Sequence, residues 1–170
     1  MRFLRSSADA LLIESENPDE SLAAGRALGE ALPPGMLLLL TGGLGMGKTK
    51  FTQGVGAALG IERVKSPTFI IMNEYDGKTP FLHADLYRLE DAGEVEELAI
   101  EEYLDDGYAA AVEWGERWLE PPEKRLEVEF SPSPAGESSR ILTFRAFEPE
   151  GRALLAEFKE KILRLTENVK

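Results

Sequence analysis

Short apolar runs alternate along the chain with amphipathic segments, and this alternation predicts a layered α/β domain. The segment 36–40 is apolar at every position, which is typical of a strand buried on both faces of a parallel sheet. The predicted strands of this apolar type lie at 11–15, 36–40, 68–75, 80–87 and 109–114.

Helices are predicted between these strands. In the segment 17–32, Asn17 is suited to the N-cap and Pro18 to the first helical position. The segment 48–59 also has helical spacing, and Gly60 follows it as a suitable end. Further helices are predicted in the acidic segment after Arg88 and in the amphipathic tail from 149 to 165.

Two kinds of antiparallel pairing are expected. The strands at 68–75 and 80–87 are joined by the turn 76–79, which predicts a hairpin. Two alternating segments, 125–130 and 140–147, predict an antiparallel annex near the C-terminus. We therefore expect one three-layer α/β domain over residues 1–170. Its sheet should be mixed and mainly parallel, with an antiparallel C-terminal annex.

Composition narrows the class of protein. The 170 residues include 43% hydrophobic residues and no cysteine, which fits a globular domain without disulfides or thiolate metal sites. No apolar run approaches the roughly 20 residues of a membrane span, so we expect a cytoplasmic protein without a membrane partner. The net charge of −12 repels phosphate backbones, so unaided nucleic-acid binding is not expected.

The acidic residues are unevenly distributed. The stretch 90–106 contains nine acidic residues and no lysine or arginine. A solvated helix face explains this pattern, and a docking face for a basic partner is the alternative.

A glycine-rich segment, TGGLGMGKTKF, lies between the apolar strand 36–40 and the next helix. From Gly42 to Thr49 it matches the phosphate-binding loop G-x-x-x-x-G-K-[ST]. Such glycines let main-chain N–H groups turn inward around an anion, and the helix N-terminus adds partial positive charge. Lys48 is expected beside the nucleotide phosphates and Thr49 on Mg²⁺. The predicted binding segment is Gly43, Leu44, Gly45, Met46, Gly47, Lys48, Thr49 and Lys50.

Magnesium needs further oxygen ligands, and two acids close apolar strands. Asp85 ends FLHAD and Glu113 ends AAAVE. Ligands of open α/β sheets lie beyond the carboxyl ends of the parallel strands, so both acids are candidates for the metal site.

Four further residues have candidate roles. Ser66 and Thr68, in VKSPTF, carry hydroxyls that a γ-phosphate-sensing loop could use, although a plain Ser-Pro turn explains them equally well. His83 is the only histidine and shares a strand face with Asp85. Trp114 follows Glu113 and is either a core residue or a neighbour of the nucleotide.

Together, the segments GGLGMGKTKF, VKSPTF, HADLYRL, EELAIEEYL and VEWGER resemble the TsaE family, small bacterial P-loop proteins that help to make threonylcarbamoyladenosine in transfer RNA. The resemblance implies a mixed-sheet P-loop fold that binds ATP with Mg²⁺ and hydrolyses it slowly. It also implies action with the proteins TsaB and TsaD, and contact with transfer RNA only through that complex.

The resemblance also implies residue roles. Lys48 resembles the phosphate lysine, and Thr49 and Glu113 resemble the magnesium ligands. Asp85 resembles a magnesium-linked or water-orienting acid, so that Lys48, Asp85 and Glu113 form the catalytic set. The segment 66–68 resembles a switch, and Trp114 the tryptophan beside the nucleotide. His83, Tyr87 and Arg88 match the pattern without a clear role.

The chain departs from the family at several positions. Gly43 stands where an acid is usual, which leaves the rate of hydrolysis open. The other departures are Met46 for alanine, Lys50 for threonine, Ala99 for glycine and Gly115 for proline.

Three other functions compete with an accessory ATPase. A small-molecule kinase usually needs a lid with arginines, and no arginine-rich segment is present. A GTP switch usually carries N-K-x-D, and the nearest string, NEYD at 73–76, has glutamate in place of lysine. A nucleotide-binding scaffold that never turns over remains open because of Gly43.

Overall fold

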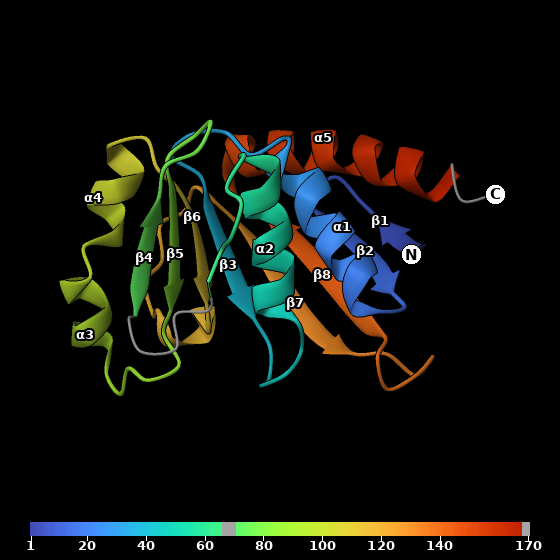
Figure 1. Cartoon of the computed structure of the whole chain (residues 1–170), viewed down its shortest axis with the longest axis horizontal. Helices are drawn as coiled ribbons and strands as arrows, with labels where there is room; N and C mark the ends of the chain where they lie inside the picture. The colour runs from blue at the N-terminus through green and yellow to red at the C-terminus, as the bar shows by residue number, and fades with distance from the viewer. Residues whose placement is uncertain (66–70, 168–170) are drawn as a thin grey trace.

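An eight-stranded mixed sheet runs through the molecule and has helices on both faces (Figure 1). The computed structural model describes residues 1–65 and 71–167. The strand order is β1-β2-β8-β7-β3-β6-β5-β4. The strands are β1 (Arg2–Ser6), β2 (Ala10–Ser15), β3 (Leu37–Thr41), β4 (Met72–Tyr75), β5 (Phe81–Asp85), β6 (Ala109–Glu113), β7 (Arg125–Pro132) and β8 (Arg140–Ala146). The helices are α1 (Pro18–Gly29), α2 (Lys48–Ala58), α3 (Ala92–Glu97), α4 (Ile100–Asp105) and α5 (Glu148–Glu167), with a short 3₁₀ helix η1 (Gly115–Arg117).

Four neighbouring strands in the middle of the sheet, β7, β3, β6 and β5, are parallel. Strand β4 pairs antiparallel with β5 and forms the predicted hairpin. On the other side, β8, β2 and β1 continue the sheet in antiparallel fashion. The mixed three-layer fold is therefore as predicted, but the sheet is not mainly parallel, since four of the seven pairings among the described strands are antiparallel. The structure adds that β7 pairs parallel with β3 while its other edge starts the antiparallel annex, and that β1, which the sequence analysis did not identify, ends that annex.

Two clusters of buried apolar side chains lie on opposite faces of the sheet. On one face, α1, α2 and α5 share a core with residues such as Leu38, Leu40 and Phe144. On the other face, α3 and α4 cover Leu39, Val112 and their neighbours. Strand β3 contributes alternate leucines to both cores, which explains why its sequence is apolar at every position.

Among the described residues, no helix covers the second face of the annex. Strand β7 alternates buried and half-buried residues, and the outward side chains form ion pairs such as Arg145 with Glu129 at 2.8 Å. A strand with one solvated face reads as alternating polar and apolar residues. This explains why 125–130 looked like an antiparallel strand although one of its edges is parallel.

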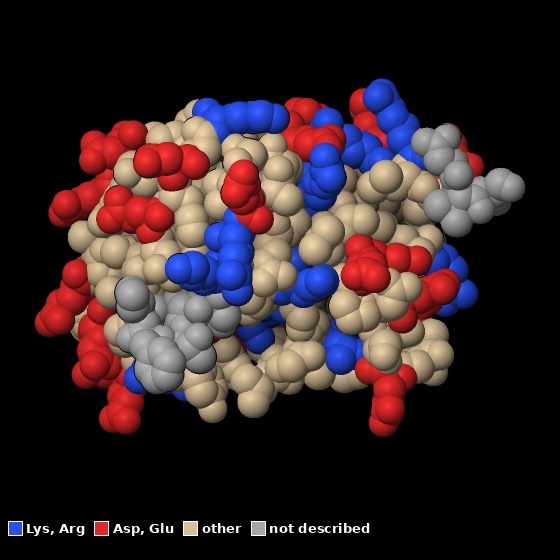
Figure 2. Space-filling model, in the orientation of Figure 1, with Lys and Arg blue, Asp and Glu red and all other residues tan. Residues whose placement is uncertain are grey.

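The acidic stretch 90–106 forms α3 and α4 rather than one helix. Asp91 caps α3 through a capping box with Glu94. Val95, Ile100 and Leu104 face the core, and every acidic side chain of the stretch is exposed. Figure 2 shows these acids along the side of the molecule formed by the two helices. The exposure is that of a solvated helix face.

Helices α1 and α2 pack closely because each places a glycine against the main chain of the other. A Cβ built on Gly54 of α2 would lie 2.1 Å from the carbonyl oxygen of Leu22, and one on Gly25 of α1 would lie 2.1 Å from that of Phe51. This contact fixes α2, whose first turn carries Lys48 and Thr49.

Within the described residues, every helix is too short or too polar for a membrane-crossing segment.

We expect Gly54→Ala to destabilise the protein by about 1–3 kcal/mol, since overpacking outweighs the gain of up to about 1 kcal/mol in helix propensity. The measurement is the free energy of unfolding in denaturant. The control is Gly136→Ala, where the nearest atom to the new Cβ, Ser139 Oγ, is 3.6 Å away. Equal stability of the two variants would contradict the close helix contact.

Candidate functional site

Lys48, Thr49, Asp85 and Glu113 meet where β3, β5 and β6 end at one edge of the sheet. In the register of the parallel strands, Leu40 lies opposite Glu113, and Asp85 lies opposite Glu113 from the other side. The main-chain N–H of Leu86 also donates to the carbonyl oxygen of Glu113 at 3.1 Å. The two acids are therefore neighbours beside the glycine-rich loop, which follows Thr41 directly.

The glycine-rich loop turns through left-handed backbone conformations. Gly45 and Gly47 have φ of 73° and 97°, which other residues rarely adopt. Gly42, at φ 127°, lies so close to β7 that a Cβ would be 2.4 Å from the carbonyl oxygen of Phe130. Among the described residues, the main-chain N–H groups of 43–47 donate no hydrogen bond within the protein. Such N–H groups at a helix N-terminus form a site for an anion.

Lys48 is a buried cation without an acidic partner. Its side-chain nitrogen donates to the carbonyl oxygens of Gly42 at 2.5 Å and Gly43 at 2.8 Å, and lies 4.4 Å from the centre of the Trp114 ring. No described carboxylate oxygen lies within 4.0 Å of this nitrogen, although the residue is only 4% exposed. Burial lowers the pKa of Lys48, and the nearby charges of Glu113 and other acids offset this only in part.

Glu113 connects the loop helix with β5. Its Oε2 accepts the hydroxyl proton of Thr49 at 3.0 Å, and its Oε1 lies 2.8 Å from Nε2 of His83. Both Glu113 and His83 are buried. A carboxylate held at both oxygens has a defined orientation, so the Glu113 side chain presents a fixed edge to Thr49.

Asp85 is held differently. Its Oδ1 accepts the main-chain N–H of Tyr87 at 2.9 Å. Burial raises the pKa of Asp85 above its ordinary value, the hydrogen bond from Tyr87 opposes this shift, and the charge of Glu113 adds to it. Raised carboxyl pKa values are typical of sites that gather negative charge for a cation or a proton.

Trp114 and Tyr87 form one wall of the site. Their ring centres are 4.8 Å apart, and Trp114 has a left-handed backbone with φ 58°. The turn packs tightly, because a Cβ on Gly115 would lie 2.4 Å from Cγ of Leu39. A strained residue that the surrounding packing holds in place is common at functional sites.

The other predicted residues lie in different environments. Leu44 is 74% exposed, and Met46 packs against the core. The side-chain nitrogen of Lys50 lies 4.0 Å from Oδ1 of Asp19. Ser66 and Thr68 lie outside the described residues. Arg140 of β8, which the sequence analysis missed, donates to the carbonyl oxygen of Gly45 at 3.4 Å. No local pattern around Arg140 indicates this contact, because β8 is distant from the loop in sequence.

The residues present fit a nucleotide with Mg²⁺. The N–H groups of the loop and the buried Lys48 suit phosphate oxygens. Within the described residues, no group of three or more acidic or histidine side chains could hold a metal by itself. Magnesium characteristically uses one or two carboxylates and takes most of its other ligands from phosphates and water, which matches Glu113 and Asp85 beside the Thr49 hydroxyl.

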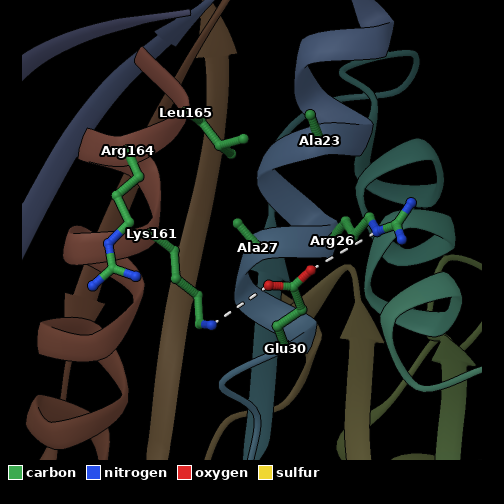
Figure 3. Close-up of a pocket in the computed structure, with 7 residues that line it drawn as sticks. All are labelled: Ala23, Arg26, Ala27, Glu30, Lys161, Arg164 and Leu165. Carbon is green, nitrogen blue, oxygen red and sulfur yellow. Dashed lines mark hydrogen bonds and ion pairs between the residues drawn. The ribbon is translucent and has the colours of Figure 1, made fainter. Parts of the chain in front are cut away.

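A separate hollow of about 460 Å³ lies between α1 and α5 (Figure 3). Its basic side chains are offset by acids, since Lys161 and Arg26 both approach Glu30, at 3.4 and 3.9 Å. It contains no residue of the glycine-rich loop, β5 or β6. The chemistry described above therefore does not extend to this hollow.

The junction of a buried strand, a glycine-rich turn with its lysine, and a helix defines P-loop proteins, and the fold and the site place the chain in this class. The family model "Threonylcarbamoyl adenosine biosynthesis protein TsaE" matches residues 15–141. The chain belongs to the TsaE family.

Similar proteins agree with this assignment. The chain is 42% identical over 133 residues to the tRNA threonylcarbamoyladenosine biosynthesis protein TsaE of Bacillus subtilis, a match that covers 76% of this chain and 82% of that protein. It is 47% identical over 104 residues to the TsaE protein of Synechocystis, covering 58% and 66% of the two chains. The crystal structure of Bacillus subtilis YdiB superposes with a TM-score of 0.74 at 32% identity, covering 89% of this chain and 95% of that one.

We expect Asp85→Asn to be more stable than the unchanged protein at pH 7. An acid whose folded pKa is raised binds more protons when folded, so its unfavourable contribution appears as pH rises through that pKa. The difference in unfolding free energy between the two proteins should therefore shrink as the solution is acidified from pH 7 through the raised pKa, and should stay constant below the ordinary aspartate pKa. A pH-independent difference would contradict the burial of this carboxylate.

Proposed function

We propose that this protein is a Mg²⁺-dependent, slowly hydrolysing ATPase that supports threonylcarbamoyladenosine modification of transfer RNA in the cytoplasm. Membership of the TsaE family supports the pathway, because the relatives carry that role in their names. The partners would be the proteins TsaB and TsaD. Transfer RNA would be reached only through that complex, which agrees with the net charge of −12.

The buried ammonium group of Lys48 is the observation that carries ATP binding. An isolated buried charge is unfavourable, and carbonyl oxygens satisfy it less well than an anion does. Phosphate oxygens at the loop would give Lys48 a full counter-charge and the loop N–H groups their acceptors. The sequence and the geometry therefore support the same ligand.

The other residues would position and polarise the nucleotide. Thr49 and Glu113 would hold Mg²⁺, directly or through its waters, and the ion would neutralise charge on the phosphates. Asp85 would orient water or the metal's water beside Glu113. Trp114 and Tyr87 would shield the Lys48 side of the site from solvent. Slow turnover is expected from the resemblance to the TsaE family, and Gly43, which offers no acid in the loop, leaves its rate open.

We expect Lys48→Ala to weaken ATP binding by about 30-fold or more, since losing one partner of a buried charge pair costs about 2–5 kcal/mol. Calorimetry with ATP and Mg²⁺ measures this affinity. Lys78→Ala, which removes an exposed lysine in the turn after β4, is the matched control and should bind as the unchanged protein does. An unchanged affinity in folded Lys48→Ala would refute the loop assignment.

We expect ATP turnover to be slow for the protein alone and to rise when TsaB and TsaD are added together. Phosphate release is measured in each mixture, with formation of threonylcarbamoyladenosine in transfer RNA followed in parallel. Transfer of phosphate from labelled ATP to a nucleoside or sugar would instead favour a kinase. ATP binding without turnover, with or without the pair, would favour a scaffold.

A further inference from the structure

His83 is a fully buried side chain that touches the proposed metal site. It lies on β5, two residues before Asp85 and on the same face of the strand. Its Nε2 lies 2.8 Å from Oε1 of Glu113, whose other oxygen accepts the hydroxyl of Thr49. Among the described residues, its Nδ1 has no hydrogen-bond partner. Within the part of the chain that the structure describes, the only hydrogen bond of the ring is thus the one with Glu113.

The partners determine which ring nitrogen carries the proton. An ionised Glu113 can only accept, so the contact at Oε1 requires a proton on Nε2. The hydrogen bond therefore places a proton on Nε2.

We propose that His83 is a positioning residue for the nucleotide-bound Mg²⁺. By donating to Oε1, it fixes the Glu113 side chain so that Oε2 faces Thr49, the hydroxyl at the start of the loop helix. Groups that orient metal-binding carboxylates in this way typically change metal affinity about 10–100-fold when they are removed. The proposal rests on the proposed function, since it concerns the same nucleotide site.

Asp85 does not share this support. Its carboxylate is held by the main-chain N–H of Tyr87, so the two neighbouring acids are oriented by separate donors. Loss of the His83 donor should consequently disturb Glu113 and leave the loop N–H groups and Lys48 in place. Mg²⁺-dependent binding and Mg²⁺-free binding are then expected to respond differently.

Two substitutions separate the donor from the bulk of the ring. The amide nitrogen of His83→Gln falls at the place of Nε2, whereas that of His83→Asn falls near Nδ1 and cannot reach Glu113. Affinity for a non-hydrolysable ATP analogue is measured with Mg²⁺ and with chelator. We expect His83→Asn to reduce the enhancement by Mg²⁺ at least about tenfold while Mg²⁺-free affinity stays within about twofold, and His83→Gln to restore most of the enhancement.

Two controls test whether the effect passes through Glu113. Leu82→Val weakens packing at the residue of β5 that precedes His83 and lies on the opposite face of the strand. This variant should keep the full enhancement by Mg²⁺. Adding His83→Asn to Glu113→Gln should cause no further loss of enhancement. An undiminished enhancement in His83→Asn would overturn the proposal, as would an equal loss with and without Mg²⁺.

A measurement on the unchanged protein keeps the proposal testable even where a variant does not fold. His83 is the only histidine, so its ring nitrogens give unambiguous NMR signals after selective ¹⁵N labelling. We expect the Nε2-protonated form, and a shift of the Nε2 signal when Mg²⁺ is added to protein saturated with the nucleotide analogue. A ring that carries its proton on Nδ1 instead of Nε2 would overturn the positioning role. An Nε2 signal that does not shift when Mg²⁺ is added would also overturn it.

These outcomes are distinct from failure of the proposed function. A protein that binds no nucleotide under any condition would refute the ATPase itself. A protein that binds Mg²⁺ with the nucleotide normally while His83→Asn behaves like the unchanged chain would refute only the role of His83.

Discussion

The parallel pairing of β3 with β6, and of β6 with β5, is the constraint on which the site depends. Parallel strands end at the same edge of a sheet, so the loop after β3 and the acids that end β5 and β6 are brought together. The register places Glu113 opposite both Leu40 and Asp85. A one-residue slip would turn Glu113 to the other face of the sheet and separate it from Thr49.

The site gathers charges that a folded protein ordinarily avoids burying. Lys48 lies among carbonyl oxygens, and Asp85 and Glu113 are neighbours with like charge. Lys48 donates hydrogen bonds to main-chain carbonyl oxygens, and both acids accept hydrogen bonds, which keeps the arrangement intact although it is unfavourable for stability. The close glycine contact between α1 and α2 contributes to this rigidity, because it anchors the helix that begins at Lys48.

The two halves of the sheet serve different purposes. The parallel half is covered on both faces and carries the chemistry, whereas the annex has one solvated face with ion pairs. The annex still reaches the site at two points, through the close approach of Phe130 to Gly42 and through the hydrogen bond from Arg140 to Gly45. The acidic helices α3 and α4 cover the face of the sheet opposite α1 and α2. Their charged side chains remain in solvent (Figure 2).

Local chemistry in the sequence determined most of the elements and the position of the loop. The continuous apolar run before Gly42, the glycines and Lys48 are short-range signals, since strand, turn and helix follow one another in the chain. Asp85 and Glu113 were identified because they end strands. Only the tertiary structure decided that β7 pairs parallel with β3, that His83 holds Glu113, and that Arg140 reaches the loop. These contacts join residues separated by 30 positions or more, and no local pattern encodes which strand edges meet or which side chains face each other across the sheet.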